Sequence, residues 1–407
     1  MSTTEAAIGA PANGTKVIGL ISAGHFYSHF FTLLLPPLFP LLHGVYGVSY
    51  TALGLAVSVY SITTGLLQAP MGFMVDRHGA RRILLAGLLV ESVAFALIGV
   101  FPVYGALVAL MAVAGAADSV VHPADYTILS ASVDRARMGR AFSIHTFAGF
   151  AGSAVAPFTV LALTAAFGWQ AALTACGLAG VAVVGVMWLQ SDLLRDRETA
   201  EADARGARAG GGGVRLLLTL PIVMALLFYV GISITGRGVS EFGVTSLHLL
   251  HGIDLTRAGA VVSAYLFSMP IGVLIGGVIA DRVSRHDVVA ASCFVIVGGC
   301  VIAIGSLDLD LTAVMALLVV AGLANGIVAP SRDMLVRRVT PPGQTGKVFG
   351  FVSTGFNIGG TVGPVTYGWI LDHVDPRAVF WLAGTMALLT MLTVLETGRR
   401  GRSAAPG

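Results

Sequence analysis

The chain contains twelve apolar runs, each long enough to cross a lipid bilayer as a helix. A bilayer core of about 30 Å needs about 20 apolar residues in a helix, and it contains no water to satisfy an open backbone. Only 11% of the residues are charged, against about 25% in an average soluble domain. A water-facing globular fold is therefore excluded, and the sequence predicts an all-α membrane protein with twelve transmembrane helices. The runs lie at roughly 17–42, 51–75, 82–101, 103–131, 140–167, 169–190, 217–248, 258–280, 287–306, 311–335, 347–371 and 378–396.

One polar segment divides the runs into two groups of six. Residues 191–215 are charged and then glycine-rich, a composition typical of a flexible linker. The predicted organisation is a tail, a six-helix bundle, a linker, a second bundle and a second tail, at residues 1–16, 17–190, 191–215, 216–396 and 397–407.

Positive charge is distributed unevenly over the predicted loops. Of the 24 lysines and arginines, only Arg237, Arg257 and Arg377 fall on the side opposite the N-terminus. Because loops rich in Lys and Arg stay in the cytoplasm, we expect a multi-pass protein of the bacterial inner membrane with both termini cytoplasmic. The net charge of +3 gives no indication of nucleic-acid binding.

Two motifs recur at nearly the same offset. The segment from Gly72 to Arg77 resembles the segment from Gly277 to Arg282, at a shift of 205 residues. A Gly/Asx/Pro pattern around Asp118 returns around Asn325, at a shift of 207 residues. A duplication of this kind predicts two pseudo-symmetric six-helix bundles, which can rock about a shared site near the bilayer midplane.

The loop after the second run carries the pattern G-x-x-x-D-R-x-G-x-R-R. This pattern resembles the signature loop of the major facilitator superfamily, and the resemblance implies a gating role in alternating access. The alternative is that these arginines only fix the topology. The residues that match are Gly72, Asp76, Arg77, Gly79, Arg81 and Arg82, with Asp281 and Arg282 in the weaker second copy.

Two further patterns bear on the branch of that family. The pairs His25/His29 and His122-Pro123 are similar to the branch that includes the fosmidomycin-resistance transporters. Drug–proton antiporters of the family usually carry an arginine in the fourth span, and Met111 occupies that position here. The multidrug signature is therefore incomplete.

Several ionisable residues lie inside predicted spans, where charge is costly and usually functional. Asp118, His122 and Asp125 share one face of the fourth span, and with His25 they are the predicted proton-coupling residues. Asp125 and Arg332 occupy equivalent positions of the repeat, so we expect them to face each other. They either form a structural ion pair or compete for a substrate carboxylate and a proton.

Polar residues on the helices that line the central cavity in this family are the candidates for substrate binding. Arg237 suits a carboxylate or phosphonate, although Glu241 one turn away could neutralise it. The alternative for each candidate is hydrogen bonding between helices. The predicted substrate-binding residues are Arg237, Arg332, His29, Tyr27, Tyr265 and Asn357.

The function these features favour is proton-coupled transport of a small organic anion by a monomer. The alternative is efflux of drugs or toxic compounds by proton antiport. We also considered a transporter fold used as a sensor, but the loops offer no soluble module. The sequence shows no nucleophile–base set and no phosphate loop, so we expect neither an enzyme nor a cofactor. A metal site built from His25, His29, Asp118 and His122 is conceivable, but no ligand spacing predicts one.

Overall fold

The structure is a computed structural model, and it describes residues 14–134, 137–194, 214–341 and 344–403. Within these ranges the chain folds into helices and contains no strand. The predicted linker and the predicted N-terminal tail fall largely outside these ranges, so those boundaries stay predictions. The last helix runs on to Ser403, within the predicted tail at 397–407. The helices of the first half are α1 (Gly14–Thr32), η1 (Pro36–Leu38), α2 (Phe39–Tyr46), α3 (Tyr50–His78), α4 (Ala80–Val100), α5 (Tyr104–Asp118), α6 (Val121–Ser132), α7 (Met138–Phe167), α8 (Trp169–Leu189) and η3 (Ser191–Leu193).

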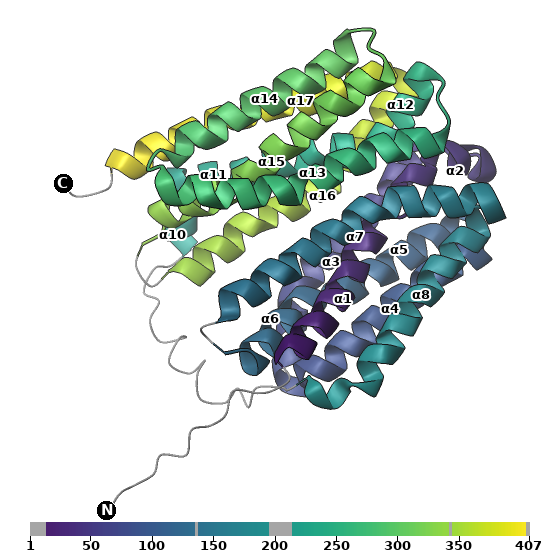
Figure 1. Cartoon of the computed structure of the whole chain (residues 1–407), viewed down its shortest axis with the longest axis horizontal. Helices are drawn as coiled ribbons and strands as arrows, with labels where there is room; N and C mark the ends of the chain where they lie inside the picture. Colours follow the sequence, from purple (N-terminus) through teal and green to yellow (C-terminus); the bar gives the residue numbers. More distant parts are fainter. Residues whose placement is uncertain (1–13, 135–136, 195–213, 342–343, 404–407) are drawn as a thin grey trace, which may run out of the picture.

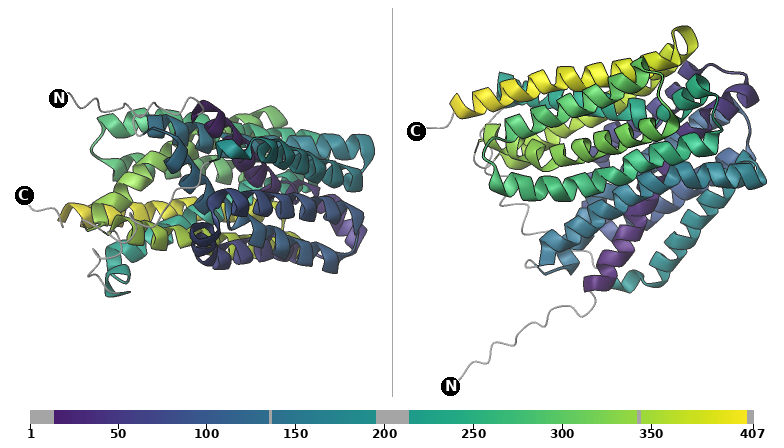
Figure 2. Two further views of the ribbon diagram at one scale, coloured as in Figure 1. Left: turned by 90° about the horizontal axis from the view of Figure 1, so that it is seen from below. Right: turned by 45° about the horizontal axis from the view of Figure 1, so that its top comes forward.

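The second half repeats the pattern of long helices joined by short connections. Its helices are α10 (Val214–Leu217), α11 (Leu220–Ser240), α12 (Gly243–His251), α13 (Leu255–Arg282), α14 (His286–Ser306), α15 (Leu311–Val339), α16 (Thr345–His373) and α17 (Pro376–Ser403). Figure 1 shows two bundles side by side, α1–α8 in purple to teal and α11–α17 in green to yellow. The right-hand view in Figure 2 shows the same division.

In the described part of the chain, twelve long helical segments, six in each bundle, run along the length of the molecule. Eleven of them, counted over the described residues, are long and apolar enough to cross a membrane. The twelfth is α16, which has 29 residues and packs between α3 and α11. The predicted fold class, an all-α membrane protein of two six-helix bundles, is therefore confirmed.

Three predicted spans are interrupted: the first, the fourth and the seventh, which breaks between Ser240 and Gly243. The first span breaks between α1 and α2, where Pro36 and Pro37 lie in the 3-10 turn η1. The fourth span breaks between Asp118 and Val121. Pro123 has no N–H to donate to the Ser119 carbonyl, so the helical hydrogen bond is missing here. The Ser119 hydroxyl also donates to the Ala116 carbonyl of the preceding turn. The second break places Asp118 at a helix end.

The bundles meet most closely along α3 and α16. A Cβ at Gly54 of α3 would lie 2.2 Å from the Pro364 carbonyl oxygen of α16, so only glycine permits this approach. The Ser58 hydroxyl donates to the Thr361 carbonyl (2.6 Å), one turn further along α3. The backbone amides of Tyr50 and Thr51 donate to Asp372 near the end of α16. We call this end of the molecule the closed end.

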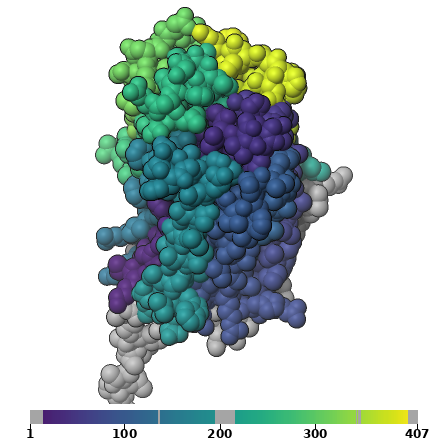
Figure 3. All heavy atoms as spheres, turned by 90° about the vertical axis from the view of Figure 1, so that its right-hand side faces the viewer, coloured from purple at the N-terminus to yellow at the C-terminus, as the bar shows by residue number. Residues whose placement is uncertain are grey.

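The closed end is covered by both bundles. The ring of Phe39 packs edge-to-face on Phe242, with centroids 5.4 Å apart. In the space-filling view of this end (Figure 3), purple atoms of the first span lie directly against green and yellow atoms of the second bundle. The ribbons diverge toward the opposite end (Figure 1). The motif residues Asp76 to Arg82 lie where α3 ends and α4 begins, at the end of α3 away from Tyr50. We call that end the open end.

Candidate functional site

A cavity of about 320 Å³ lies between the two bundles. Six helices contribute to it, from both halves of the repeat: α1, α7, α11, α13, α15 and α16. A cavity of this kind, at the interface of two repeats, is where transporters of this architecture hold their substrates. The polar and aromatic residues that line it are His29, Thr32, Phe150, Ser153, Ser233, Arg237, Ser240, Glu241, Tyr265, Asn325 and Phe356.

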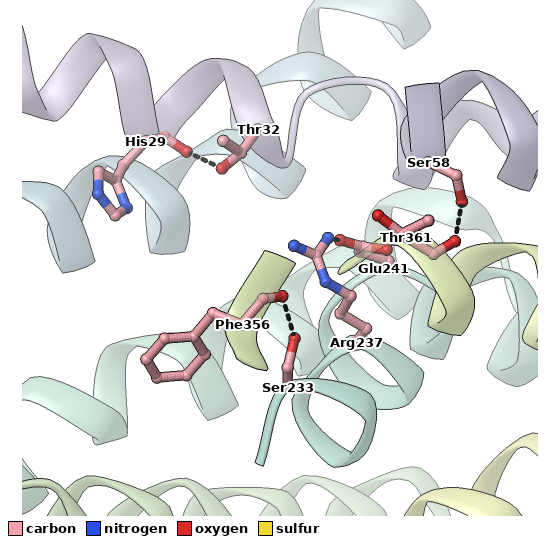
Figure 4. A network of polar contacts seen from close by, with 8 residues as sticks. All are labelled: His29, Thr32, Ser58, Ser233, Arg237, Glu241, Phe356 and Thr361. Atoms are coloured by element: carbon pink, nitrogen blue, oxygen red, sulfur yellow. Dashed lines mark hydrogen bonds and ion pairs between the residues drawn. The ribbon is translucent and has the colours of Figure 1, made fainter. Parts of the chain in front are cut away.

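Arg237 is the cation of this cavity. It lies near the C-terminal end of α11 and pairs with Glu241 one turn later. The Glu241 side chain is 3% exposed and the Arg237 side chain 26%, so the guanidinium is the more accessible partner. In Figure 4 the guanidinium points from α11 toward the purple helices of the first bundle. Because Glu241 occupies only part of its five N–H donors, Arg237 can still bind an anion.

Glycine brings a neighbouring backbone up to this arginine. A Cβ at Gly360 of α16 would lie 2.5 Å from Nη2 of Arg237 and 3.0 Å from the Ser61 hydroxyl of α3. Arg237 therefore lies where α3 and α16 of opposite bundles meet. A group bound to the N–H donors that Glu241 leaves unoccupied would lie between the two bundles, and movement of one bundle against the other would change its contacts.

Two neutral side chains complete the wall from the second bundle. The Asn325 amide donates to the Tyr265 hydroxyl (3.0 Å), and both side chains are buried. Ser233 donates to the Phe356 carbonyl (2.9 Å), as drawn in Figure 4. Asn325 is the repeat equivalent of Asp118, a relationship that could have marked it as a site residue from the sequence.

The opposite wall consists of His29, Thr32 and Ser153. His29 is the outermost member of a histidine cluster in the first bundle, with its ring centroid 4.4 Å from that of His25 and 5.9 Å from that of His122. His145 of α7 lies 3.8 Å from His25, ring to ring. From the sequence, His145 is not favoured as a site residue, because it stands alone in its span.

Asp118 and Glu91 form two further polar contacts in the first bundle. The Ser28 hydroxyl donates to Asp118 (2.6 Å), which links α1 to α5. The Tyr60 hydroxyl donates to Glu91 (2.9 Å), a side chain with no exposed surface. Among the described residues, no lysine or arginine contacts either carboxyl group. The sequence left Glu91 without a partner, because Tyr60 comes from another helix.

The expected pair of Asp125 and Arg332 does not form. Asp125 is buried in the first bundle, 3.6 Å from His25 Nδ1 and 3.5 Å from His145 Nε2. Arg332 pairs instead with the adjacent Asp333 (2.9 Å). Its guanidinium also lies 5.0 Å from the Tyr229 ring centroid and 5.5 Å from that of Phe356, both cation–π contacts. Partners on its own bundle satisfy Arg332, so the bundles are not joined here.

The other predicted residues are divided between the cavity and its surroundings. Tyr265 lines the cavity, whereas Tyr27 packs among the rings of Phe26, Phe30 and Phe31. Tyr27 is two residues from both His25 and His29 on α1, so it projects from a different face of the helix. Asn357 lines a separate groove between α3 and α16, next to Gly65.

The predicted gating residues lie at the open end. Gly79 adopts φ 91°, which ends α3 and begins α4, so the glycine of the motif meets a backbone need. Arg81 contacts the Ser191 carbonyl and Asp192, both in its own half. Asp76 and Arg77 are exposed, as are Arg82 and, in the second copy, Asp281 and Arg282.

Two six-helix bundles around a shared polar cavity define a membrane transporter of the two-repeat type. The chain belongs to the Major Facilitator Superfamily, whose sequence profile matches residues 21–249 and 226–406. Members of this family are transporters and not enzymes, as predicted.

Individual relatives agree with this assignment. The chain is 23% identical to the fosmidomycin resistance protein of Escherichia coli K12, over 96% of this chain and 97% of that protein. It is 24% identical to the probable sulfoacetate transporter SauU of Cupriavidus necator, over 91% and 90%. The fold matches the crystal structure of a bacterial homologue of the lysosomal transporter Spinster, inward-facing and unoccupied. That match has a TM-score of 0.82 and 13% identity, over 98% of this chain and all of the other.

Proposed function

We propose that the protein transports a small organic anion of the carboxylate or phosphonate type across the bacterial inner membrane, coupled to protons. The observation that carries the proposal is Arg237, a guanidinium at the interface of the two bundles that faces the shared cavity. A guanidinium offers two parallel N–H donors to a carboxylate or phosphonate. The names of two relatives support an anionic substrate, because fosmidomycin is a phosphonate and sulfoacetate is a sulfonate with a carboxylate.

Proton coupling rests on Asp118. Its carboxyl group lies at the break between α5 and α6 and is bonded to a neutral serine, with no lysine or arginine among its described contacts. An ionised carboxylate inside the membrane without a cation costs several kcal/mol. Taking up a proton removes that cost, so Asp118 is the group we expect to load and release the proton. The repeat-equivalent residue, Asn325, is neutral.

The orientation follows from the loop charges. We propose that both termini and the open end face the cytoplasm, which makes this structure inward-open. Alternating access then requires the contacts between Tyr50, Thr51 and Asp372 at the closed end to break while the motif residues Asp76 to Arg82 engage.

The test is uptake of sulfoacetate and fosmidomycin by purified protein in liposomes. We expect Arg237→Ala to reduce the uptake of both probes at least about 100-fold, because a charge-assisted hydrogen-bond pair of this kind is worth about 3 kcal/mol. Arg257→Ala, which changes an exposed arginine outside the cavity, is the matched control. Uptake of either anion that persists in Arg237→Ala at the wild-type rate would contradict the proposal.

A second function, efflux of drugs by proton antiport, is favoured by one observation: the relative named for fosmidomycin resistance matches 96% of the chain. Expression in a drug-sensitive bacterium separates the two. Resistance to apolar cations that does not depend on Arg237 supports drug efflux, whereas resistance confined to anionic compounds supports the first proposal.

A further inference from the structure

Three side chains from three helices of the first bundle meet at one buried point. They are His25 of α1, Asp125 of α6 and His145 of α7, which are 5%, 0% and 1% exposed. One ligand atom from each, two imidazole nitrogens and a carboxylate oxygen, lies within 4.8 Å of the others. This point is separate from the cavity, because none of the three residues lines it.

The polar atoms at this point are unsatisfied. Among the described residues, neither oxygen of Asp125 has a hydrogen-bond partner, and neither has Nδ1 of His25 nor either ring nitrogen of His145. The distances of 3.6 and 3.5 Å from Asp125 Oδ2 to the two imidazoles are too long for hydrogen bonds. Each buried polar group left unpaired costs about 1–3 kcal/mol. Three of these atoms, one from each residue, lie within 4.8 Å of one another, which indicates that a bound group belongs between them.

The spacing distinguishes a metal ion from a water molecule. Two ligand atoms 3.5–3.6 Å apart subtend an angle of about 110–120° at an ion bonded to each at about 2.1 Å, near the tetrahedral angle. At a water bonded to each at about 2.8 Å they subtend only about 80°, well below the angle that water prefers. The donor set of two imidazoles and one carboxylate also suits zinc and similar ions rather than Mg²⁺ or Ca²⁺.

We propose that His25, Asp125 and His145 bind one divalent first-row transition-metal ion of the zinc class. The ion replaces the missing partners of these atoms and neutralises Asp125, which no lysine or arginine among the described residues contacts. It joins α1 to α6 and α7 directly behind His29, so it holds the cavity wall of the first bundle in place. The fourth coordination position belongs to water or to His122, whose buried Nδ1 is unpartnered and whose ring centroid lies 5.2 Å from that of His25.

Glycine provides the room for this arrangement. A Cβ at Gly149 of α7 would lie 2.6 Å from Nε2 of His25 and 3.2 Å from His29. The imidazoles of α1 can therefore reach the face of α7 that carries His145, one turn before Gly149. Ligand spacing along the sequence does not predict this site, because its three ligands come from three different helices, α1, α6 and α7.

The test uses purified full-length protein, stripped of metal with a chelator and titrated with Co²⁺ and then Zn²⁺. We expect one Co²⁺ per chain, with the visible ligand-field bands of a tetrahedral nitrogen–oxygen site, displaced by Zn²⁺. Asp125→Asn and His145→Gln should each weaken binding at least about 100-fold. His78→Gln, an exposed histidine at the end of α3, is the matched control and should bind as the wild type does. None of these readouts depends on transport.

Two results would overturn the proposal. One is a folded wild-type protein that binds no Co²⁺ or gives octahedral bands only. The other is Asp125→Asn and His145→Gln variants that bind the ion as tightly as the wild type. If a variant elutes as an aggregate, the melting temperature of the wild type with Zn²⁺ tests the proposal instead. A specifically bound ion stabilises the folded state and raises the melting temperature, whereas an unchanged melting temperature contradicts the site.

Discussion

The carboxylate of Asp372, in the second bundle, caps the N-terminus of α3 in the first bundle, at Tyr50 and Thr51. It accepts the backbone N–H groups of Tyr50 and Thr51, each at 2.8 Å, and the Thr51 hydroxyl. These are first-turn N–H groups of α3, which have no partner within their own helix. The cap exists only while the bundles are together at the closed end, so it stabilises one state of the transport cycle.

Removing this cap should therefore shift the conformational equilibrium. We expect Asp372→Ala to disfavour closure of this end by about 1–2 kcal/mol, the usual value of a helix cap with its dipole interaction. That corresponds to a population shift of about 5- to 30-fold. The measurement is the distance distribution between spin labels at Val45 and Val374, two exposed positions at the closed end.

The matched control is Asp375→Ala. Asp375 accepts the backbone N–H of Arg377 (2.7 Å) and so caps α17 inside its own bundle. Its loss should lower stability without changing the distance distribution. Identical distributions for wild type and Asp372→Ala would show that the cap does not hold the closed end.

A second prediction concerns the glycine contact on α3. Gly54→Ala places a methyl group 2.2 Å from the Pro364 carbonyl, and overpacking of this kind costs about 1–3 kcal/mol. We expect the same spin labels to report a wider closed end. Gly350→Ala, on the helix of Pro364 but with open space around it, should have no such effect. A Gly54→Ala distribution like that of Gly350→Ala would contradict the assigned contact.

A third prediction separates the two roles of the Arg237–Glu241 pair. Arg237→Met alone leaves Glu241 buried without a cation, so we expect a loss of about 3–5 kcal/mol in stability. Arg237→Met with Glu241→Gln removes both charges and should restore most of that stability without restoring anion uptake. Thermal unfolding and uptake, measured on both variants, check this. Recovery of anion uptake in the double variant would contradict the assignment of Arg237 as a substrate-binding residue.

A fourth prediction addresses the charge of Glu91. If the carboxyl group is neutral in its bond with Tyr60, Glu91→Gln keeps the acceptor and should change the free energy of unfolding by less than about 1 kcal/mol. Tyr60→Phe removes the hydrogen-bond donor found for Glu91 and should cost about 1–3 kcal/mol. A large loss in Glu91→Gln would instead show that the ionised form is required.

The spans could be predicted closely because hydropathy acts locally. The end of α3 at His78, for example, follows from Gly79 and from the charges beside it. The break at Ser119 was not predicted. Pro123 lies just after this break, whereas the equivalent proline, Pro330, lies inside the continuous helix α15. A proline alone therefore does not decide whether a membrane helix breaks.

The cavity could be predicted only in part. Arg237, His29 and Tyr265 were identified because they are polar residues in apolar spans that the family resemblance places at the cavity. An ion pair between Asp125 and Arg332, one of the two alternatives, does not form here, because repeat symmetry relates positions and not side-chain partners. His145 and Glu91 gained their significance from His25 and Tyr60 on other helices, and a single sequence does not reveal such contacts.

The central claim, proton-coupled anion transport through Asp118, is tested most directly by sulfoacetate accumulation in proteoliposomes under an imposed pH gradient. With one proton coupled to each anion transported, a gradient of about one pH unit drives about tenfold accumulation. We expect the wild type, and Asp308→Asn as a surface control, to accumulate the anion under one sign of the gradient. Asp118→Asn should lose this accumulation and keep anion counterflow. Accumulation by Asp118→Asn equal to that of the wild type would contradict the account.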